Sequence, residues 1–213
     1  MMEEIKKKKR PQTLGEEIGN AITHGVGALA AIAGLVLMII KSDTGLELAG
    51  SIVFGVSMFL VYLSSCLYHC FKNGSTVKKI FRIFDHSAIY IQIAGTYTTI
   101  LLCVLGGWLG WVYFGLQWAV VVIGILIRIL KPGKNTIPQV ILCLLLGWSG
   151  LSILPQIYNF SPALLWLVLA GGVMYSGGVA FYASRFKYAH FVWHFFVIFG
   201  TVCHFIGVFG FIL

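Results

Sequence analysis

Seven long apolar stretches dominate this 213-residue chain, and the short segments between them hold almost all of its charged residues. A stretch of about 20 apolar residues is long enough to cross the hydrocarbon core of a bilayer, which is about 30 Å thick. Hydrophobic residues make up 59% of the chain and charged residues only 10%, whereas a soluble domain has roughly 25% charged residues. The sequence therefore predicts an all-α integral membrane protein with no room for a sizeable soluble domain.

The apolar stretches predict seven transmembrane helices. They cover residues 20–40, 48–70, 83–104, 108–130, 138–154, 162–182 and 190–212. Proline supports several of these limits, since Pro132 with Gly133 breaks the chain after the fourth stretch and Pro138 suits the first turn of the fifth. We expect two parts: a basic cytoplasmic N-terminal tail at residues 1–19 and a seven-helix transmembrane domain at residues 20–213.

Lysine and arginine are distributed unevenly over the connections between the predicted helices. When the connections are assigned alternately to the two sides of the membrane, every one of the 15 basic residues except Lys41 falls on the same side. The positive-inside rule then places the N-terminus in the cytoplasm and the C-terminus outside. This orientation is opposite to that of the G-protein-coupled receptors. The net charge of +8 has the same topogenic origin, so we expect no nucleic-acid partner.

The N-terminus and the cysteines bear on processing and compartment. The first ten residues are basic, but no short apolar core with a small-residue cleavage site follows them. We therefore predict that the first span is retained and not removed as a signal peptide. All five cysteines lie inside apolar stretches, which favours small buried packing residues over a disulfide framework.

Polar residues from three predicted helices share one depth in the membrane. Counting inward from the flanking basic residues at about 1.5 Å per residue places His69, Asp85 and His190 about 4.5 Å inside. Ser65 and His194 lie one turn deeper, each four positions from a histidine and on the same helix face. Ionisable groups in a membrane are costly and normally face the bundle interior, where a functional site is the default hypothesis.

Three imidazoles, a carboxylate and a hydroxyl suit a zinc site. His69, His190 and His194 are the candidate ligands, with the fourth position left to water as in catalytic zinc sites. Zinc could lower the pKa of this water to about 7, which would make it a nucleophile, and could polarise a carbonyl oxygen. Asp85 could orient the water or act as general acid and base, and Ser65 could hydrogen-bond the water or a developing oxyanion. Alternatively, Asp85 could only be a favourable charge at a helix N-terminus.

Five other residues have simpler interpretations. We expect His24 to be a packing or positioning histidine and not a fourth ligand. His86 is predicted at the membrane interface, and His204 lies too deep in the last helix to share the metal. Cys66 and Cys70 flank His69 and could suggest a thiolate site, but core packing is the favoured interpretation.

At these residues the sequence resembles the hemolysin III family, the bacterial relatives of the progestin and adipoQ receptors. This family is part of a membrane hydrolase superfamily that includes alkaline ceramidases. The resemblance covers nearly the whole chain and is carried by EEIGNAITHGVG at 16–27, SSCLYHC at 64–70, FDHSAIYIQIAGTYT at 84–98 and HFVWHFF at 190–196. The superfamily pattern falls on Ser65 and His69, on Asp85, and on His190 and His194.

The resemblance implies a seven-helix bundle with zinc held by the three histidines near the cytoplasmic face, and hydrolysis of a lipid amide. Together with the short connections it suits a multi-pass protein of a bacterial inner membrane. We therefore expect a zinc-dependent membrane hydrolase that acts on an amide or ester of a membrane lipid. The long N-terminal domain of the animal receptors is missing, so a role as an adiponectin-type receptor is not implied.

A second class of function stays open from the sequence. The chain could be a non-enzymatic membrane protein, either a receptor-like signalling bundle or the cytolytic, pore-forming factor that the family name suggests. A pore-former needs an exposed amphipathic segment, and few charged residues lie outside the short connections. A transporter would need paired broken helices at the midplane, and the sequence shows none. A bis-histidine haem is also conceivable, and a Soret band in the purified protein would reveal it.

Overall fold

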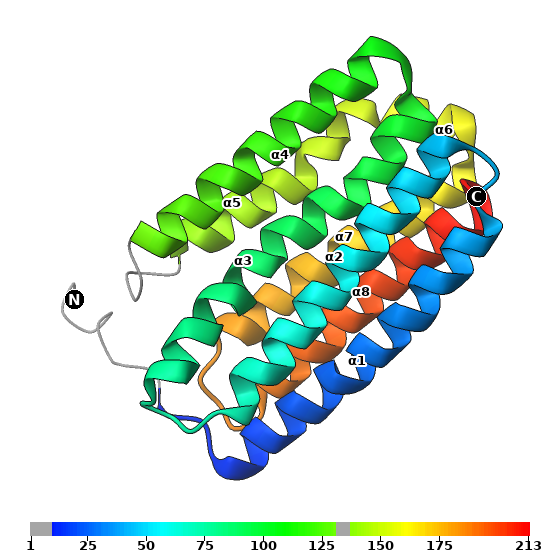
Figure 1. The fold of residues 1–213 in the computed structure, drawn as a ribbon. Coiled ribbons are helices and arrows are strands. Elements are labelled where there is room, and N and C mark those ends of the chain that lie inside the picture. The colour runs from blue at the N-terminus through cyan, green and yellow to red at the C-terminus, as the bar shows by residue number, and fades with distance from the viewer. Residues whose placement is uncertain (1–9, 131–136) are drawn as a thin grey trace.

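The structure, a computed structural model, describes residues 10–130 and 137–213, which form a bundle of long helices (Figure 1). The helices are α1 (Leu14–Lys41), α2 (Gly45–Cys70), α3 (Thr76–Thr99), α4 (Gly107–Leu130), α5 (Ile137–Trp148), α6 (Leu154–Phe160), α7 (Pro162–Ala183) and α8 (Ala189–Phe211). A π-helical turn, Ile100–Leu105, continues α3, and a 3-10 segment, Ser149–Ile153, joins α5 to α6. Seven of the continuous helical stretches are long and apolar enough to cross a membrane. The predicted seven-helix bundle is confirmed.

Two helices begin well before the predicted residues 20 and 83, because hydropathy detects the lipid-covered turns and misses polar first turns. Thr13 and Glu16 form a capping box at the start of α1, in which each side chain accepts a hydrogen bond from the other residue's backbone N–H. Ser75 caps α3 through its hydroxyl. Polar residues of the loops predicted from the sequence therefore lie inside helices and can face the bundle.

The fifth span ends later than the predicted residue 154. It continues through the 3-10 segment into α6 and ends at Phe160. Pro155 does not stop it, because proline in the first turn of a helix has no backbone hydrogen bond to lose.

The order of the helices in space places the first and last spans side by side. Helix α1 packs against α2 and α8, α2 packs against α3, and α7 packs against α8 (Figure 1). Gly95 lets α3 approach α2 closely, since a Cβ at this position would overlap the hydroxyl of Ser57. Helices α4 and α5 lie along the opposite side of α3. The first, second and last spans therefore form one compact group.

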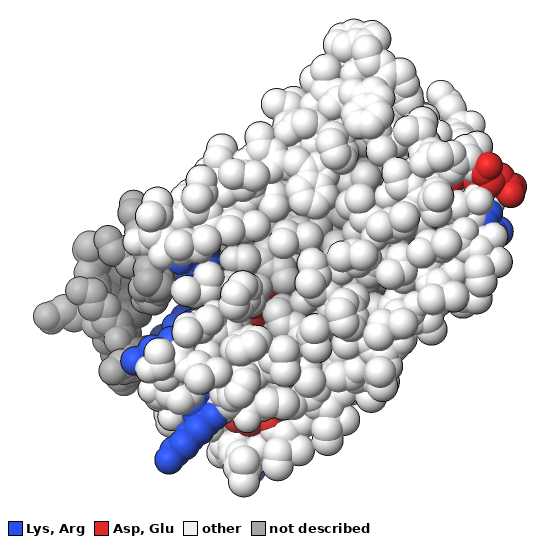
Figure 2. All heavy atoms as spheres, viewed as in Figure 1, with Lys and Arg blue, Asp and Glu red and all other residues white. Residues whose placement is uncertain are grey.

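Charged side chains gather at the two ends of the bundle. Figure 2 shows basic side chains mainly at the end where α1 begins, with a few acidic atoms recessed among their neighbours, and acidic side chains beside a basic one at the opposite end, where α1 and α2 connect. The long surface between the ends is almost free of charge in this view. This distribution suits a protein surrounded by lipid. The assignment of the N-terminal end to the cytoplasm stays a prediction.

Candidate metal centre

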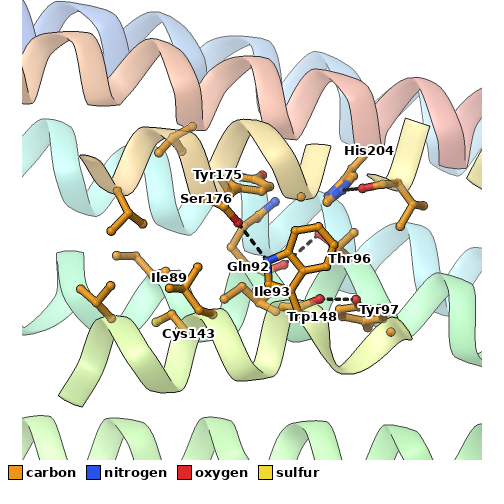
Figure 3. Close-up of a pocket in the computed structure, with 18 of the residues that line it drawn as sticks. Ile89, Gln92, Ile93, Thr96, Tyr97, Cys143, Trp148, Tyr175, Ser176 and His204 are labelled. Atoms are coloured by element: carbon orange, nitrogen blue, oxygen red, sulfur yellow. Dashed lines mark hydrogen bonds between the residues drawn. The ribbon is translucent and has the colours of Figure 1, made fainter. Parts of the chain in front are cut away.

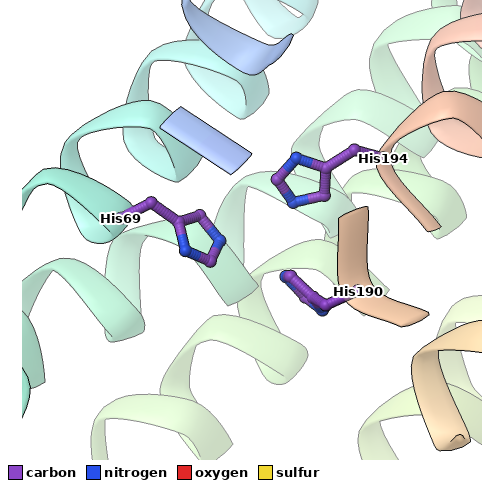
Figure 4. A group of neighbouring side chains, drawn as sticks. All are labelled: His69, His190 and His194. Carbon is purple, nitrogen blue, oxygen red and sulfur yellow. The ribbon is translucent and has the colours of Figure 1, made fainter. Parts of the chain in front are cut away.

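Helices α2 and α8 bring three histidines together near the N-terminal end of the bundle (Figure 4). His69 comes from the last turn of α2, and His190 and His194 come from the first two turns of α8. One ring nitrogen of each residue lies within 4.8 Å of the other two. The ring centroid of His69 is 5.1 Å from that of His190 and 5.2 Å from that of His194. The three predicted ligands therefore form a group that could hold a metal ion.

Glu17 of α1 fixes the orientation of His69. One carboxylate oxygen lies 2.7 Å from His69 Nδ1, and the other forms an ion pair of 2.8 Å with Lys78 Nζ. A carboxylate accepts hydrogen bonds, so Nδ1 carries the proton and Nε2 keeps its lone pair. The buried Nε2 atom has no hydrogen-bond partner in the part of the chain that the structure describes. A carboxylate behind an imidazole with a free nitrogen is typical of a metal ligand.

Thr23 of α1 fixes His194 in the same way. Its hydroxyl donates to the backbone carbonyls of Gly19 and Asn20 one turn earlier, at 3.1 and 3.0 Å. The single hydroxyl proton is thus engaged, so Thr23 Oγ1 accepts the hydrogen bond from His194 Nδ1, which is 3.0 Å away. The lone pair of His194 is therefore on Nε2. Helix α1 supplies none of the predicted ligands, but its side chains contact two of the ligand histidines and orient their rings.

His24 contacts the site through the face of His194. The two rings stack with their centroids 3.6 Å apart and their planes at 6°, and Tyr62 contacts His24 edge-on at 5.2 Å. The His24 nitrogens do not belong to the group of possible ligand atoms. The stacking restricts the plane of the His194 ring and agrees with the expected packing role.

The Glu17→Gln variant is expected to bind zinc about 10- to 100-fold more weakly, because the amide cannot hold the His69 ring as a carboxylate does. Titration of purified protein with zinc in a competing chelator measures this affinity. Glu47→Gln is the control, since Glu47 accepts hydrogen bonds from the backbone of Asp43 and Thr44 at the start of α2, at the end of the bundle opposite the histidines. Equal zinc affinities for the Glu17→Gln variant and the wild type would show that Glu17 does not support the ligand.

Asp85 and Ser65 lie next to each other beside the histidines. Ser65 is buried one turn before His69. The carboxylate of Asp85 has a side-chain hydrogen-bonding interaction with Ser65, and it is close enough to His69, Arg82 and Arg128 to interact with their charges. All five residues selected from the sequence therefore occupy one region of the bundle. The chemical roles of Asp85 and Ser65 stay predictions.

The prediction that His86 lies at the membrane interface is wrong. Because α3 begins at Thr76, His86 falls in its third turn and is buried. Its backbone carbonyl accepts a hydrogen bond of 3.1 Å from Gln139, and its Nε2 atom lies 3.9 Å from a carboxylate oxygen of Asp85.

The expectation of small buried cysteines is also inaccurate. All five cysteines are free thiols, as expected, but Cys70 is exposed and the others are only partly buried. In a membrane protein such positions face lipid as well as protein, so an apolar stretch does not by itself imply burial in the bundle.

An apolar cavity of about 140 Å³ lies beside the histidines, between α3, α5, α7 and α8 (Figure 3). Its wall consists mainly of aliphatic and aromatic side chains. Tyr182 and Trp193 line it near the metal centre, where the ring centroid of Tyr182 is 6.0 Å from that of His190. His204 lines it deeper in the bundle. The cavity therefore extends from the vicinity of the histidines into the membrane layer.

A smaller polar pocket approaches His190 from the N-terminal end of the bundle. Its lining includes Arg10, Gln12, Glu16, Tyr182, Ser184 and His190. Arg10 and Glu16 form a two-point ion pair of 2.5 and 2.8 Å in its wall. Tyr182 lines both this pocket and the apolar cavity. Of the three histidines, His190 lines the polar pocket, and Tyr182 connects this pocket with the apolar cavity, whose lining includes none of the three.

The fold and the site define the class of protein: an all-α membrane protein with seven transmembrane helices and a group of three histidines, of which His69 and His194 are buried and His190 is partly buried. The model of the family described as "Haemolysin-III related" matches residues 12–205. This chain belongs to that family, as the resemblance predicted.

Two curated proteins are similar to this chain over almost its whole length. Hemolysin-3 of Bacillus cereus is 38% identical over 207 residues, which is 95% of this chain and 94% of that protein. The Hemolysin-3 homolog of Bacillus subtilis (strain 168) is 38% identical over 201 residues, which is 92% of this chain and 94% of that protein. With its seven apolar helices, the chain is a multi-pass protein of a bacterial cell membrane.

Proposed function

We propose that this protein is a zinc-dependent membrane hydrolase that cleaves an amide or ester bond of a lipid near the cytoplasmic face of the membrane. The observation that carries this proposal is that the group of three histidines borders the polar pocket through His190 and lies next to Tyr182, which lines both that pocket and the apolar cavity. A lipid can place its apolar chain in the cavity, while its polar part and a water molecule reach the histidines from the other side. A hydrolase of lipids needs this combination.

The donor set fits zinc better than other common metals. Three neutral imidazoles with no thiolate and an open fourth position are typical of catalytic zinc sites. The tautomer set by Glu17 leaves a free Nε2 lone pair on His69, and Thr23 Oγ1 lies 3.0 Å from Nδ1 of His194. Zinc, when bound, would supply a Lewis acid for a carbonyl oxygen and a water molecule with a pKa near 7.

Asp85 and Ser65 supply the remaining chemistry in this proposal. The Asp85 carboxylate takes a proton from the attacking water and delivers it to the leaving group. The hydroxyl of Ser65 holds this carboxylate in place through their hydrogen-bonding interaction. Lys78 pairs with Glu17, whereas Arg82 and Arg128 are the basic residues near Asp85. Tyr182 separates the lipid chain from the polar pocket.

The test is metal analysis combined with a lipid assay on detergent-purified protein. We expect about one zinc ion per chain, and turnover of lipid amides or esters that a chelator abolishes and added zinc restores. A panel of ceramides, other N-acyl lipids and phospholipids identifies the substrate. Protein without near-stoichiometric zinc would refute the metal centre, and zinc without turnover of any lipid in the panel would leave a structural metal.

The names of the two hemolysin relatives favour one alternative, a cytolytic factor without enzymatic activity. Leakage of dye from liposomes distinguishes the two candidates. Leakage that persists after all three histidines are replaced by alanine would support the cytolytic alternative. Leakage that disappears together with zinc would attribute it to the metal centre.

A further inference from the structure

Gln92 places an unsatisfied polar atom in the middle of the apolar cavity (Figure 3). The side chain comes from α3 and is only 4% exposed. Its Oε1 atom lies 3.0 Å from the hydroxyl of Ser57, and its amide lies near the hydroxyl of Tyr175, but its Nε2 atom makes no hydrogen bond within the described ranges. A buried amide with an open hydrogen-bonding position is costly in an apolar environment.

Exchanging the oxygen and nitrogen of the Gln92 amide does not remove this open position. The hydroxyl of Ser57 also lies 2.7 Å from the carbonyl of Phe54, and it has only one proton. If this proton goes to Phe54, the amide nitrogen of Gln92 donates to Ser57 and the amide oxygen is left open. If the proton goes to Gln92, the nitrogen is left open. Either arrangement leaves one polar atom of Gln92 for a ligand.

His204 provides a second open atom on the wall of the same cavity (Figure 3). Its Nε2 atom donates to the carbonyl of Val168 at 3.1 Å, since a carbonyl can only accept. The lone pair is therefore on Nδ1, which is buried without a hydrogen-bond partner among the described residues. An acceptor in the cavity wall thus accompanies the open amide of Gln92.

Gln139, at the cavity wall, also has a buried side-chain oxygen without a partner among the described residues, whereas Thr96 and Trp148 are satisfied by the protein. The hydroxyl of Thr96 donates to the backbone carbonyl of Gln92 at 3.0 Å. Trp148 Nε1 donates to the hydroxyl of Ser176 at 2.9 Å, and Figure 3 shows this hydrogen bond. Open polar atoms are therefore not a general property of the wall.

Both open atoms lie too deep to take part in bond cleavage. Gln92 is seven residues beyond Asp85 on α3, which is about 10 Å along a helix, and His204 is ten residues beyond His194 on α8, about 15 Å. A lipid chain that extends from the histidines into the cavity would pass them with its middle part.

We propose that the cavity selects a lipid chain that carries a hydroxyl group near its middle, with Gln92 and His204 as the residues that recognise it. A hydroxyl both donates and accepts, so it can pair with either orientation of the Gln92 amide or with the lone pair of His204, whereas a carbonyl could not pair with His204. This inference rests on the proposed function, because it takes the cavity to hold the chain of the lipid.

Binding of free fatty acids to the purified protein tests the proposal without turnover. The probes are a saturated fatty acid with a mid-chain hydroxyl and the unsubstituted acid of the same length, and quenching of tryptophan fluorescence follows binding, since Trp148 and Trp193 line the cavity. We expect the hydroxylated acid to bind about tenfold more tightly or better, because the plain chain leaves buried polar atoms unpaired. The Gln92→Leu variant should lose most of this preference and keep its affinity for the plain acid.

Thr96→Val is the matched control, because this residue lines the same cavity on the same helix but already has a partner. This variant should keep the preference. Equal binding of the two acids by the wild type, or an unchanged preference in both Gln92→Leu and His204→Leu, would overturn the inference. Size-exclusion profiles identify variants that do not fold. If Gln92→Leu does not fold, His204→Leu replaces it as the test. Binding of a free fatty acid requires neither zinc nor catalysis. A protein that hydrolyses no lipid but still prefers the hydroxylated acid would therefore refute the hydrolase proposal and not this inference.

Discussion

Protein in which His190 and His194 are both replaced by alanine is expected to purify without zinc and to show no lipid hydrolysis above background. The change removes two of the three imidazoles of the group, and His69 alone offers a single nitrogen. Metal content by mass spectrometry and turnover of the lipid found for the wild type measure the two effects. Because zinc binds only the folded protein, the variant should also lose the stabilisation that added zinc gives to the wild type.

The matched control for this variant is Phe199→Ala. Phe199 lies on the same helix and is 54% exposed on the outside of the bundle, so it contacts lipid and not the histidines. It should retain both zinc and activity. If the double histidine variant kept its zinc, the metal would be bound elsewhere, and the group of three histidines would have another role.

The sequence was sufficient to predict the spans and the histidine group, because both depend on features that can be recognised without three-dimensional information. Lipid requires long apolar stretches, which fixes the seven spans. The alternation of basic connections then gives each polar residue a depth, and His69, His190 and His194 share that depth. Residues at one depth on neighbouring helices meet if they face inward, as these three do.

The residues that orient the ligands were missed, although the sequence contains a signal for them. Glu17, Asn20 and His24 are spaced three and four positions apart, so they form a polar stripe on one face of an apolar helix, and all three are buried. Of the three, only His24 was predicted to contact the site, and Glu17 falls within residues 1–19, which were predicted to be a tail. The capping box at Thr13 places Glu17 inside the helix, where its carboxylate reaches His69.

The cavity could not be predicted, because it depends on which helices do not pack closely. Helix α5 contacts α3, α4 and α7 only in part, and the space between them is a property of several surfaces together. No periodicity in one segment specifies such a space. Gln92 and Ser57 are therefore ordinary polar residues in the sequence, and their relation to a cavity appears only in the folded bundle.

The Asp85→Asn variant is expected to lower the turnover number by about 10²- to 10⁴-fold while leaving zinc bound, because an amide fills the same space but cannot accept a proton. Turnover number and metal content are measured on the same preparation. Asp43→Asn, in the exposed connection between α1 and α2, is the control and should behave as the wild type. A parallel loss of zinc and activity in Asp85→Asn would instead indicate a role in holding the metal.

The structure also weakens the simpler explanation that Asp85 only stabilises a helix N-terminus. This effect is confined to the first turn of a helix, and Asp85 lies in the third turn of α3, which begins at Thr76. A carboxylate at this position, beside Ser65 and His69, has an unfavourable desolvation cost and no benefit from the dipole. Arg82 and Arg128 lie near this carboxylate, so its removal also leaves their positive charge less balanced. The unfolding temperature of Asp85→Asn is therefore measured beside its turnover, and reduced turnover in a protein of undiminished stability separates catalysis from folding.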